Sequence, residues 1–483
     1  MRTFFLTDDT ICAVATPSGM GALSVIRVSG PQAHEIVCRV FYQHGKPFPK
    51  EKIEGYRTYY GHIIDPNSSE NEIVDEVLAT FFVAPHSFTG EDSVEVSVHG
   101  SPYIQQRLLE LLVAGGARMA MPGEYSRRAF VNRKFDLAQA EAVADLIASQ
   151  SEAEHRLAMN QLRGGFSHEL RSLRSRLVEI TSLIELELDF AEEDVEFADR
   201  SRLKSLLHET QEHIHRLTDS FRLGNAIKNG VPVAIVGATN TGKSTLLNAL
   251  LHEDRAIVSD IAGTTRDSIE EVMNLNGTLF RFIDTAGIRE TDETIERIGI
   301  ERTFQKINEA DIVLGMIDLT QGLEAMKEAA RLILEKTDTT QQTLVLLLNK
   351  SDRCPGLGAE SVDELKNFVC DRDHATSSHV YIQTLSAKTG QGLDQLLRTL
   401  EEIQQGRSQH HDTTLVSNIR HYEALKHTAE SLKAVDRGLL EGIPSDLIAQ
   451  DLREALYHLG TITGEITTDE VLGSIFSRFC IGK

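Results

Sequence analysis

The sequence predicts a multidomain protein of the α/β plus α class. We expect an N-terminal α+β domain, an all-α helical domain, and an α/β domain with a mostly parallel sheet. This α/β domain is inserted into the helical domain. The 483 residues are enough for about three domains, each with its own core. Strand-like runs dominate the first 120 residues, and proline-free helical sequence follows. Strand and helix patterns then alternate over residues 224–405 before helical sequence returns.

Composition narrows the class of protein. A hydrophobic content of 41% with 25% charged residues is ordinary for a globular protein, and no stretch reads as a signal peptide or a membrane span. The five cysteines are scattered without a C-x-x-C pair, which excludes an obvious disulfide framework or cysteine-based zinc site. We therefore expect a cytoplasmic protein. A net charge of −23 excludes a broadly basic, nucleic-acid-coating surface, so any contact with nucleic acid must be local or shared with another subunit.

Residues 1–120 form the predicted α+β domain. The runs "TICAVATPSG", "LSVIRVSG", "VDEVLATFFVAP" and "SVEVSVHG" are short, rich in β-branched residues, and closed by glycine or proline. These features indicate several short strands.

Helical sequence flanks the inserted domain on both sides. No proline occurs between Pro122 and Pro232, and "LAQAEAVADLIASQSEAEHRLAMNQL" repeats apolar residues at steps of three and four. After the polar linker "QGRSQHHDTT" the chain is again helical to its end. We expect the helices of residues 121–223 and 406–483 to pack together as one helical domain into which residues 224–405 are inserted.

Residues 224–405 alternate between strand and helix. The strands are predicted at "VPVAIVG", "LFRFIDTAG", "DIVLGMID", "TLVLLLNKSD" and "VYIQTLSAK". This alternation of strand and helix patterns is typical of a doubly wound α/β domain.

A phosphate-binding loop follows the first of these strands. "GATNTGKST" (residues 237–245) fits G-x-x-x-x-G-K-[ST] between a strand and a helix, which is the context that the motif requires. Backbone N–H groups around Gly242 and the helix N-terminus would hold phosphate oxygens. Lys243 would reach the β- and γ-phosphates, and the Ser244 hydroxyl would bind magnesium. Asn240, Thr241 and Thr245 complete the predicted nucleotide contacts of this loop.

Four further elements in the expected order make this a guanine-nucleotide site. "DTAG" would contact the magnesium shell and the γ-phosphate, "GTTRD" would supply a second magnesium hydroxyl at Thr265, and "SAK" would support guanine O6. "NKSD" selects the base, because the Asp352 carboxylate can accept hydrogen bonds from guanine N1–H and the 2-amino group, and adenine has neither donor there. The predicted contacts from these elements are Asp284, Thr285, Ala286, Gly287, Asn349, Lys350, Asp352, Ser386 and Ala387. The inserted domain is thus predicted to be a P-loop GTPase domain of the Ras-like, TRAFAC class.

One position departs from the Ras pattern. Ras-like proteins carry a water-orienting glutamine directly after the glycine of "DTAG", whereas this chain has Ile288, which cannot orient water. Another residue and a cation must then assist hydrolysis. Nearby acids such as Glu290 and Glu296 are candidates, and the Asn240 side chain offers an oxygen to a monovalent cation near the phosphates.

The chain as a whole resembles the MnmE (TrmE) family, the bacterial tRNA-modification GTPases. The resemblance is carried by "ATPSGMGALSVIRVSG", "SFTGED", "PGEYSRRAF", "KFDLAQAEAVADLI", "GTTRD" and the terminal "FCIGK", and it runs nearly end to end. It implies a folate-binding, dimerising N-terminal domain, a discontinuous helical domain and a potassium-activated GTPase domain. It also implies an FAD-dependent partner of the MnmG type, with the FAD on the partner. Together they would add an aminomethyl-type group, such as carboxymethylaminomethyl, to carbon 5 of wobble uridine in certain tRNAs.

The resemblance also implies site residues. A tetrahydrofolate derivative (the 5,10-methylene or 5-formyl form) would contact Arg27, Glu95, Lys134 and Lys483. Potassium would be held by Asn240, Ser259, Ile261 and Thr264, of which Ser259 and Thr264 also lie near the nucleotide, and Glu296 would orient water. In this family the P-loop usually has proline before the asparagine, whereas this chain has Thr239.

Two rival interpretations share part of the pattern. A ribosome-assembly GTPase of the Era or EngA type has the same P-loop, DTAG and NKxD elements, but it would carry a basic RNA-binding module that this acidic chain lacks. A dimerisation scaffold with a regulatory nucleotide domain is the second rival. Folate co-purification with residues 1–120 would distinguish them, because only a tRNA-modifying GTPase of this family predicts it.

The terminal segment "SIFSRFCIGK" places Cys480 three residues from the chain end, where chains usually fray. These residues alone do not decide whether the thiol is unreactive or takes part in a chemical reaction. The resemblance implies a catalytic role for Cys480 in the modification. We therefore expect the tail to be tied down in the helical domain.

Overall fold

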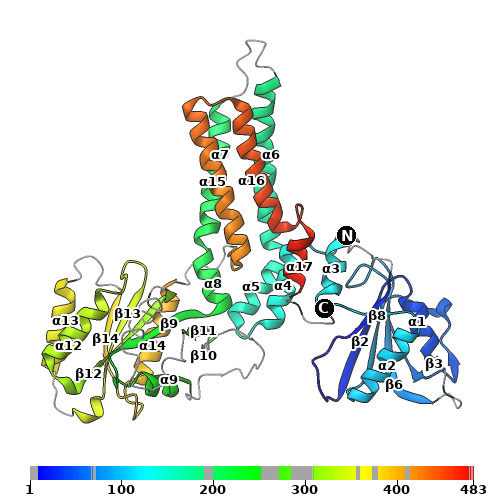
Figure 1. Cartoon of the computed structure of the whole chain (residues 1–483), viewed down its shortest axis with the longest axis horizontal. Helices are drawn as coiled ribbons and strands as arrows, with labels where there is room; N and C mark the ends of the chain where they lie inside the picture. The colour runs from blue at the N-terminus through cyan, green and yellow to red at the C-terminus, as the bar shows by residue number, and fades with distance from the viewer. Residues whose placement is uncertain are drawn as a thin grey trace. The chain divides into compact units, whose positions relative to one another are not determined.

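The computed structural model describes residues 9–66, 68, 72–189, 200–251, 271–283, 307, 309–354, 359–372, 379–407, 414–477, 479 and 482 (Figure 1). The chain divides into two compact units. The first comprises residues 1–144, 161–207 and 431–483, and the second comprises residues 145–160 and 208–430. Among the helices described, none is both long and apolar enough to cross a membrane.

The first unit contains an eight-stranded sheet in the order β4-β3-β5-β6-β7-β2-β1-β8, antiparallel except for the β1–β8 pair and built as the N-terminal α+β prediction expected. The strands are β1 (Ile11–Val14), β2 (Leu23–Ser29), β3 (Phe41–Gln43), β4 (Lys46–Pro47), β5 (Arg57–Ile64), β6 (Ile73–Phe82), β7 (Ser93–His99) and β8 (Arg118–Met119). Helices α1 (Ala33–Val40) and α2 (Pro102–Ala114) pack on one face.

Alternation along the central strands separates the two faces of this sheet. Ile26 of β2 and Val96 of β7 point into the core beneath α1 and α2, where both are fully buried. Their neighbours Arg27 and Glu95 are cross-strand partners on the opposite face. That opposite face therefore carries polar side chains at the point where β2 and β7 pair.

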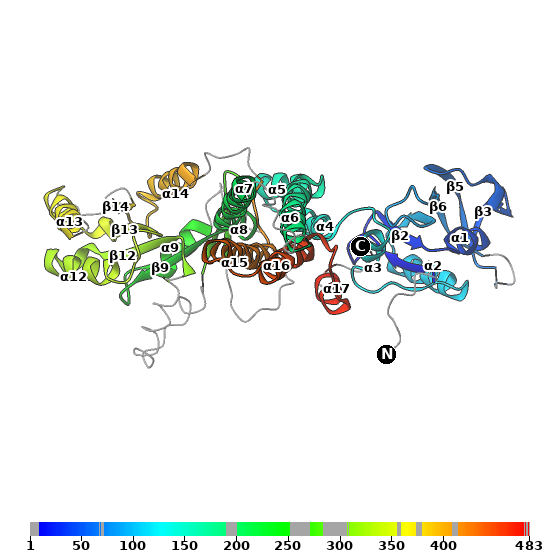
Figure 2. The same cartoon turned by 90° about the horizontal axis from the view of Figure 1, so that it is seen from above.

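Long helices come from both flanks of the predicted insertion. They are α4 (Leu137–Ala148), α5 (Glu152–Leu162), α6 (Gly165–Asp189), α7 (Arg200–Asp219), α8 (Phe221–Asn229), α15 (Ile419–Glu441) and α16 (Ser445–Thr463). In the first unit α6 and α16 lie side by side (Figure 2). Arg453 of α16 pairs with Glu185 of α6 at 2.8 Å, and Arg174 of α6 pairs with Glu465 at 2.6 Å. Helices from before and after residues 208–430 thus pack together, as expected for a domain inserted between them.

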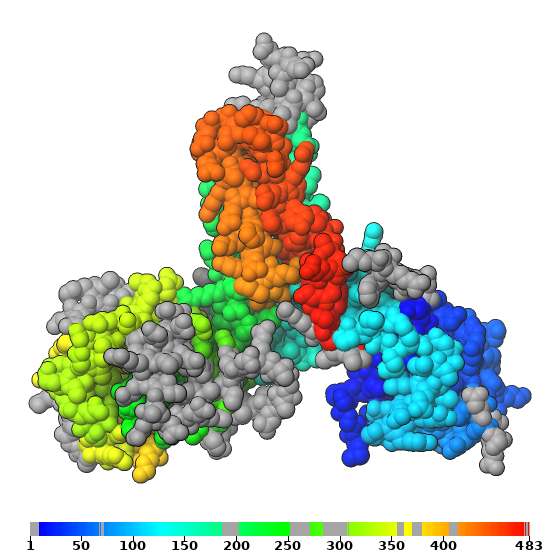
Figure 3. Space-filling model, viewed as in Figure 1, coloured from blue at the N-terminus to red at the C-terminus, as the bar shows by residue number. Residues whose placement is uncertain are grey.

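The end of the chain returns to the N-terminal part of the first unit. Helix α17 (Asp469–Phe476) packs against α3 (Glu124–Val131), and the space-filling view shows this red segment against the cyan one (Figure 3). Phe476 is buried with Leu137 in a small apolar cluster. Beyond it, Gly482 lies against Val14 of β1. The tail is therefore held partly by the N-terminal sheet, whereas the sequence analysis expected it to be tied down in the helical domain. The contact was not predicted because it joins residues that are far apart in the sequence.

The second unit contains a six-stranded sheet in the order β10-β11-β9-β12-β13-β14, parallel except for β10. The strands are β9 (Val231–Gly237), β10 (Glu271–Leu275), β11 (Thr278–Phe282), β12 (Ile312–Asp318), β13 (Thr343–Asn349) and β14 (Val380–Thr384). Helices α9 (Lys243–Leu251) and α14 (Leu393–Arg407) cover one face, and α12 (Leu323–Leu334) and α13 (Ala359–Arg372) cover the other. This confirms the predicted α/β domain. All five predicted strands are present, and β10 is an additional one.

Candidate functional site

The phosphate-binding loop lies at the carboxyl edge of the parallel sheet of the second unit. Strand β9 ends at Gly237, and α9 begins at Lys243, as the motif requires. Gly242 has φ +102°, and a Cβ there would lie 2.3 Å from Asn349 Nδ2. Gly237 has φ +151°, and a Cβ there would lie 2.5 Å from the carbonyl oxygen of Met316. Both glycines are required because the loop is closely packed and has left-handed backbone.

Lys243 bends back over this loop. Its Nζ donates to the carbonyl oxygens of Gly237 at 3.0 Å and Ala238 at 2.9 Å. Burial of the side chain lowers the pKa of Lys243. Phosphate oxygens carry full negative charge and would be stronger partners for this ammonium than the two carbonyls. The side chain is thus placed for an anion bound within the loop.

Asn349 joins the P-loop to the loops that are predicted to contact guanine. It ends β13 and is only 3% exposed. Its Nδ2 donates to the carbonyl oxygen of Thr241 at 2.7 Å, and its Oδ1 accepts from the backbone N–H of Ala387 at 2.9 Å. One buried amide therefore fixes three predicted nucleotide-binding segments relative to one another.

Lys350 has a partner that sequence reasoning missed. Its Nζ contacts Oδ2 of Asp318 at 2.6 Å, and its backbone is left-handed with φ +68°. Burial opposes ionisation of Asp318, but hydrogen bonds from Lys350 and Thr320 outweigh it and keep the pKa of Asp318 below its usual value. A usable signal was present, because Asp318 ends a fully buried strand at the edge where β9 and β13 also end.

The carboxylate of Asp352, which is predicted to select the base, is held in place by the last predicted loop. The Ser386 hydroxyl donates to Oδ1 of Asp352 at 2.7 Å. Ser386 is 1% exposed, whereas Asp352 is exposed, so a buried hydroxyl holds a carboxylate that a ligand can reach. A carboxylate fixed in this way is suited to two parallel N–H donors such as those of guanine.

The remaining P-loop predictions lie in the same segment. Asn240 is exposed with φ +59°, so its side chain extends from the loop surface. Ser244 is half-buried, and Thr245 is exposed in the first turn of α9. Ser244 therefore has a place at the helix N-terminus where a magnesium hydroxyl ligand is expected. Several predicted residues lie outside the described residues: Ser259, Ile261, Thr264, Thr265, Asp284, Thr285, Ala286, Gly287, Ile288, Glu290, Glu296, Cys480 and Lys483.

A second group of predicted residues meets on the sheet of the first unit. Arg27 donates from Nε to Oε1 of Glu95 at 2.9 Å, and its Nη2 lies 2.8 Å from the same oxygen. The Arg27 guanidinium also lies over the rings of Phe88 at 5.1 Å and Tyr125 at 5.6 Å. Sequence reasoning missed both rings. They fix the arginine through cation–π contacts, so its position does not depend on the ion pair alone.

Lys134 lies beside the loop that carries Phe88. Its Nζ donates to the carbonyl oxygen of Pro85 at 3.0 Å, and the neighbouring Phe135 ring is 6.1 Å from Phe88. Arg27 and Lys134 thus contact the loop of residues 85–91, through Phe88 and Pro85, and Glu95 joins them through its ion pair with Arg27. Their charges suit a ligand with amide-like donors at one end and carboxylates at the other.

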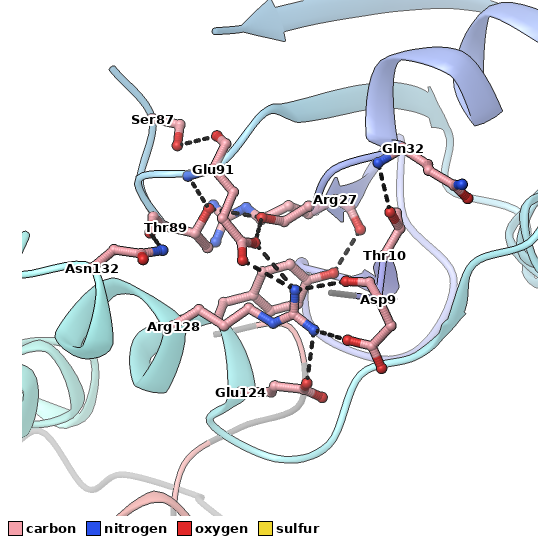
Figure 4. A network of polar contacts seen from close by, with 12 residues as sticks. Asp9, Thr10, Arg27, Gln32, Ser87, Thr89, Glu91, Glu124, Arg128 and Asn132 are labelled. Carbon is pink, nitrogen blue, oxygen red and sulfur yellow. Dashed lines mark hydrogen bonds and ion pairs between the residues drawn. The ribbon is translucent and has the colours of Figure 1, made fainter. Parts of the chain in front are cut away.

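A network of charged side chains around Arg128 lies next to this site (Figure 4). Arg128 is 3% exposed and contacts Asp9 at 2.6 Å, with Glu91 and Glu124 each at 3.2 Å. The adjacent Tyr125 hydroxyl donates to the carbonyl oxygen of Arg27 at 2.7 Å. The network therefore fixes α3, the 85–91 loop and the chain preceding β1 around the site. Its residues lie partly in "PGEYSRRAF", but no pairing could be read from that segment.

Two family models match successive segments of this chain. Residues 10–134 match the family model described as the GTP-binding protein TrmE N-terminus, and residues 137–480 match that of the MnmE helical domain.

Full-length relatives agree with the family models. Proteins named tRNA modification GTPase MnmE from Parabacteroides distasonis and Bacteroides thetaiotaomicron are each 50% identical to this chain, over 98% and 99% of its length and 100% of their own. The protein of the same name from Cytophaga hutchinsonii is 48% identical, with 100% of both chains covered. The similarity thus extends over both compact units and the terminal segment.

Proposed function

This chain belongs to the MnmE family of tRNA modification GTPases, and from that membership we propose a specific reaction for it. It hydrolyses GTP in a potassium-dependent manner and, with an FAD-dependent MnmG-type partner, adds an aminomethyl-type group to carbon 5 of wobble uridine in tRNA. A reduced folate provides the one-carbon unit. The observation that carries the proposal is the combination, in one chain, of a guanine-nucleotide site around Asn349 with the separate Arg27–Glu95 site.

The nucleotide part of the proposal rests on the loops that Asn349 joins. Lys243 and the backbone N–H groups around Gly242 would bind the β- and γ-phosphates, and Ser244 with Thr265 would hold magnesium. Asp352, fixed by Ser386 at 2.7 Å, would select guanine. The backbone of the Ser386–Lys388 loop would support guanine O6.

Potassium and Glu296 replace the missing glutamine. A monovalent cation held by Asn240, Ser259, Ile261 and Thr264 would offset the negative charge that develops between the phosphates, as an arginine finger does in other GTPases. Glu296 would orient the attacking water. Asn240 has an exposed side chain and left-handed backbone. Its side-chain oxygen is therefore accessible to a cation bound beside the phosphates.

The folate part of the proposal rests on Arg27, Glu95 and Lys134. The side chains of Arg27 and Glu95 are 19% and 31% exposed, so a ligand can reach them. A pterin presents amide-like N–H donors that suit the Glu95 carboxylate, and its glutamate tail suits Arg27, Lys134 and the terminal Lys483. When bound, the folate would supply a one-carbon unit at the oxidation level of its derivative.

Cys480 would act on the uridine. A thiolate that adds to carbon 6 of the base makes carbon 5 nucleophilic, and the thiol leaves again when carbon 5 has formed its new bond and lost its proton. The prediction is that Cys480→Ser keeps GTP turnover and loses modification. Full modification by the serine variant would mean that the reaction does not require this thiol.

The assembly that we propose is a cytoplasmic homodimer that binds tRNA and the flavoprotein partner. On the sheet face opposite α1 and α2, the cross-strand neighbours Tyr60 and Leu78 are 55% and 48% exposed, and Leu23 of β2 on the same face is 69% exposed. A second copy would cover this face. A surface shared between two subunits is one of the two ways in which so acidic a chain can bind tRNA, the other being a local basic contact.

One experiment tests the central proposal. A bacterial strain that lacks its own enzyme of this family is complemented with this chain, and wobble uridine in its tRNA is analysed by mass spectrometry. Return of the carbon 5 modification is the expected result. Unmodified uridine despite normal expression would contradict the proposal and favour the rival ribosome-assembly role, for which defective ribosomal subunits would be the corresponding phenotype.

A further inference from the structure

Strand β12 of the second unit ends in a carboxylate that is almost fully enclosed. Every residue of β12 is buried, and Asp318 at its end is 7% exposed. Asp318 lies opposite Asn349, the last residue of β13, so the two strands end together at the edge of the sheet where β9 leads into the P-loop. A buried carboxylate is costly unless it is paired and hydrogen-bonded. The partners of Asp318 therefore indicate its role.

The two oxygens of Asp318 have separate partners. Oδ1 accepts from the backbone N–H of Thr320 at 2.9 Å and from the Thr320 hydroxyl at 2.8 Å, and these bonds stabilise the short 3₁₀ helix Leu319–Gln321. Oδ2 accepts from Nζ of Lys350 at 2.6 Å. A neutral asparagine or serine side chain could also accept from Thr320 at such a turn. The negative charge of Asp318 is therefore needed only for the ammonium of Lys350.

Lys350 is a residue that gains from being held in this way. It directly follows Asn349 and has φ +68°, a left-handed conformation that costs free energy in a residue with a side chain. Its stem is long and flexible, and a lysine loses more rotamer freedom than most residues when it is fixed. An ammonium group has three donors, so the bond to Asp318 leaves donors that can contact a ligand.

We propose that Asp318 is a positioning residue for guanine-nucleotide binding, which holds the Lys350 side chain in its binding conformation before the nucleotide arrives. The inference rests on the proposed contact between Lys350 and the nucleotide. The rotamer entropy of the lysine is then lost when the chain folds and not when GTP or GDP binds, so the affinity for both nucleotides is higher. Asp318 acts through Lys350 and need not touch the nucleotide itself.

The test is equilibrium binding of fluorescent GDP and GTP analogues to the full-length variant Asp318→Asn. An asparagine keeps one acceptor oxygen for Thr320 and replaces the other with an N–H₂ group, which cannot accept from Lys350. We expect both nucleotides to bind about tenfold more weakly, mostly because they dissociate faster. Asp318→Ser retains a hydroxyl for Thr320 and has no charge for Lys350, so this second variant should behave in the same way.

Thr320→Val is the matched control. It removes the hydroxyl that donates to Oδ1 and leaves the ion pair between Asp318 and Lys350 in place. Its affinity for both nucleotides should equal that of the wild type. A tenfold loss in Thr320→Val would overturn the inference, because the effect would then come from the turn after β12 and not from Lys350.

A double-mutant cycle separates positioning from a purely structural role. Lys350→Met removes the ammonium, so adding Asp318→Asn to this variant should cause no further loss of affinity. An equal loss in both backgrounds would overturn the inference. Wild-type binding by Asp318→Asn, together with weakened binding by Lys350→Met, would overturn the inference alone. Wild-type binding by Lys350→Met would instead show that the proposed nucleotide contact of Lys350 is wrong, and the inference would fail with it.

Discussion

At the scale of single residues, Asn349 has the clearest energetic role, because its two buried hydrogen bonds connect the P-loop to the loop that is predicted to contact guanine. Replacing it with alanine removes both bonds and leaves the carbonyl of Thr241 and the N–H of Ala387 without these partners. Each buried bond is worth about 1 kcal/mol, so we expect Asn349→Ala to weaken GTP and GDP binding by about 30-fold.

The measurement is equilibrium binding of fluorescent GDP and GTP analogues. Asn229→Ala is the matched control, because Asn229 is an exposed asparagine of the same unit that bonds only to Asn225 among the contacts described. Equal loss of affinity in both variants would mean that the effect is general destabilisation and not the broken link between loops.

A second residue-scale prediction concerns Asn240 and Ile288. Because Ile288 cannot orient water and we propose that Asn240 binds a monovalent cation near the phosphates, GTP turnover should be at least tenfold faster in potassium than in sodium at equal ionic strength. Asn240→Ala should lose this difference and retain slow turnover. Steady-state phosphate release in the two salts is the measurement, and equal rates for the wild-type chain would contradict the proposed cation site.

Residue roles could be predicted from the sequence only where a motif is contiguous. Lys243 and Asp352 belong to short patterns whose spacing already expresses their geometry, and the structure places them at one edge of the sheet. Asp318 and Gly482 act through partners 32 and more than 400 residues away, so no local pattern reveals them. The rings of Phe88 and Tyr125 were missed for the same reason.

At the scale of elements, the strands of the second unit were predicted because they are continuous apolar runs, as buried parallel strands are. β10 was missed because its burial alternates and its sequence, "EVMNL", is short and mixed. A signal was nevertheless available. Asn276 and Gly277, with φ +48° and +85°, form the two-residue turn between β10 and β11, and Asn-Gly between two such runs predicts a hairpin.

Helix α3 yields a stability prediction. Arg128 of this helix is buried among Asp9, Glu91 and Glu124. Arg118 also pairs with Asp9 and Glu124, so Arg128→Met removes one of two cations from these two carboxylates and the ion-pair partner described for Glu91. Breaking a buried ion pair from one side costs about 3–5 kcal/mol, and we expect a loss of about 3 kcal/mol at pH 7. Calorimetric unfolding of the full-length chain measures it. Arg39→Met is the control, because Arg39 pairs with Glu35 on an exposed helix face, where such a pair contributes less than about 1 kcal/mol.

The same network predicts a pH dependence. Burial alone would raise the pKa of Asp9 and Glu124, but hydrogen bonds from Arg118, with Arg128 contributing, lower both below their ordinary values of 3.8 and 4.5. The folded state therefore binds fewer protons than the unfolded one in this range. The stabilisation is complete above about pH 5 and is lost as the pH falls through the lowered values. The difference between wild type and Arg128→Met should shrink from pH 7 to pH 4, and a constant difference would contradict the assignment.

At the scale of the whole molecule, the order of elements follows from the insertion. Because α6 and α16 pack together, the chain that leaves the first unit after residue 207 must return to it by residue 431, and the α/β domain lies in between. The sequence predicted this arrangement, because a helical pattern changes to alternating strand and helix patterns at the start of the α/β domain and changes back at its end. It could not predict that the tail would continue past α17 to the N-terminal sheet, and that contact joins the first and last segments of the chain.

The open face of the N-terminal sheet gives the last prediction, at the scale of the assembly. Leu78 lies in the middle of this face, opposite Tyr60 on β5 and Ser97 on β7, and it is 48% exposed in the single chain. If a second copy covers the face, Leu78→Arg places a charge in an apolar interface, and burying that unpaired charge costs more than the contact gains. We expect the wild-type chain to sediment as a dimer and Leu78→Arg as a monomer with unchanged GTP binding. Leu440→Arg is the matched control, because Leu440 is 70% exposed on α15, away from the sheet. A dimer that survives Leu78→Arg, or one that Leu440→Arg disrupts equally, would exclude this face as the interface.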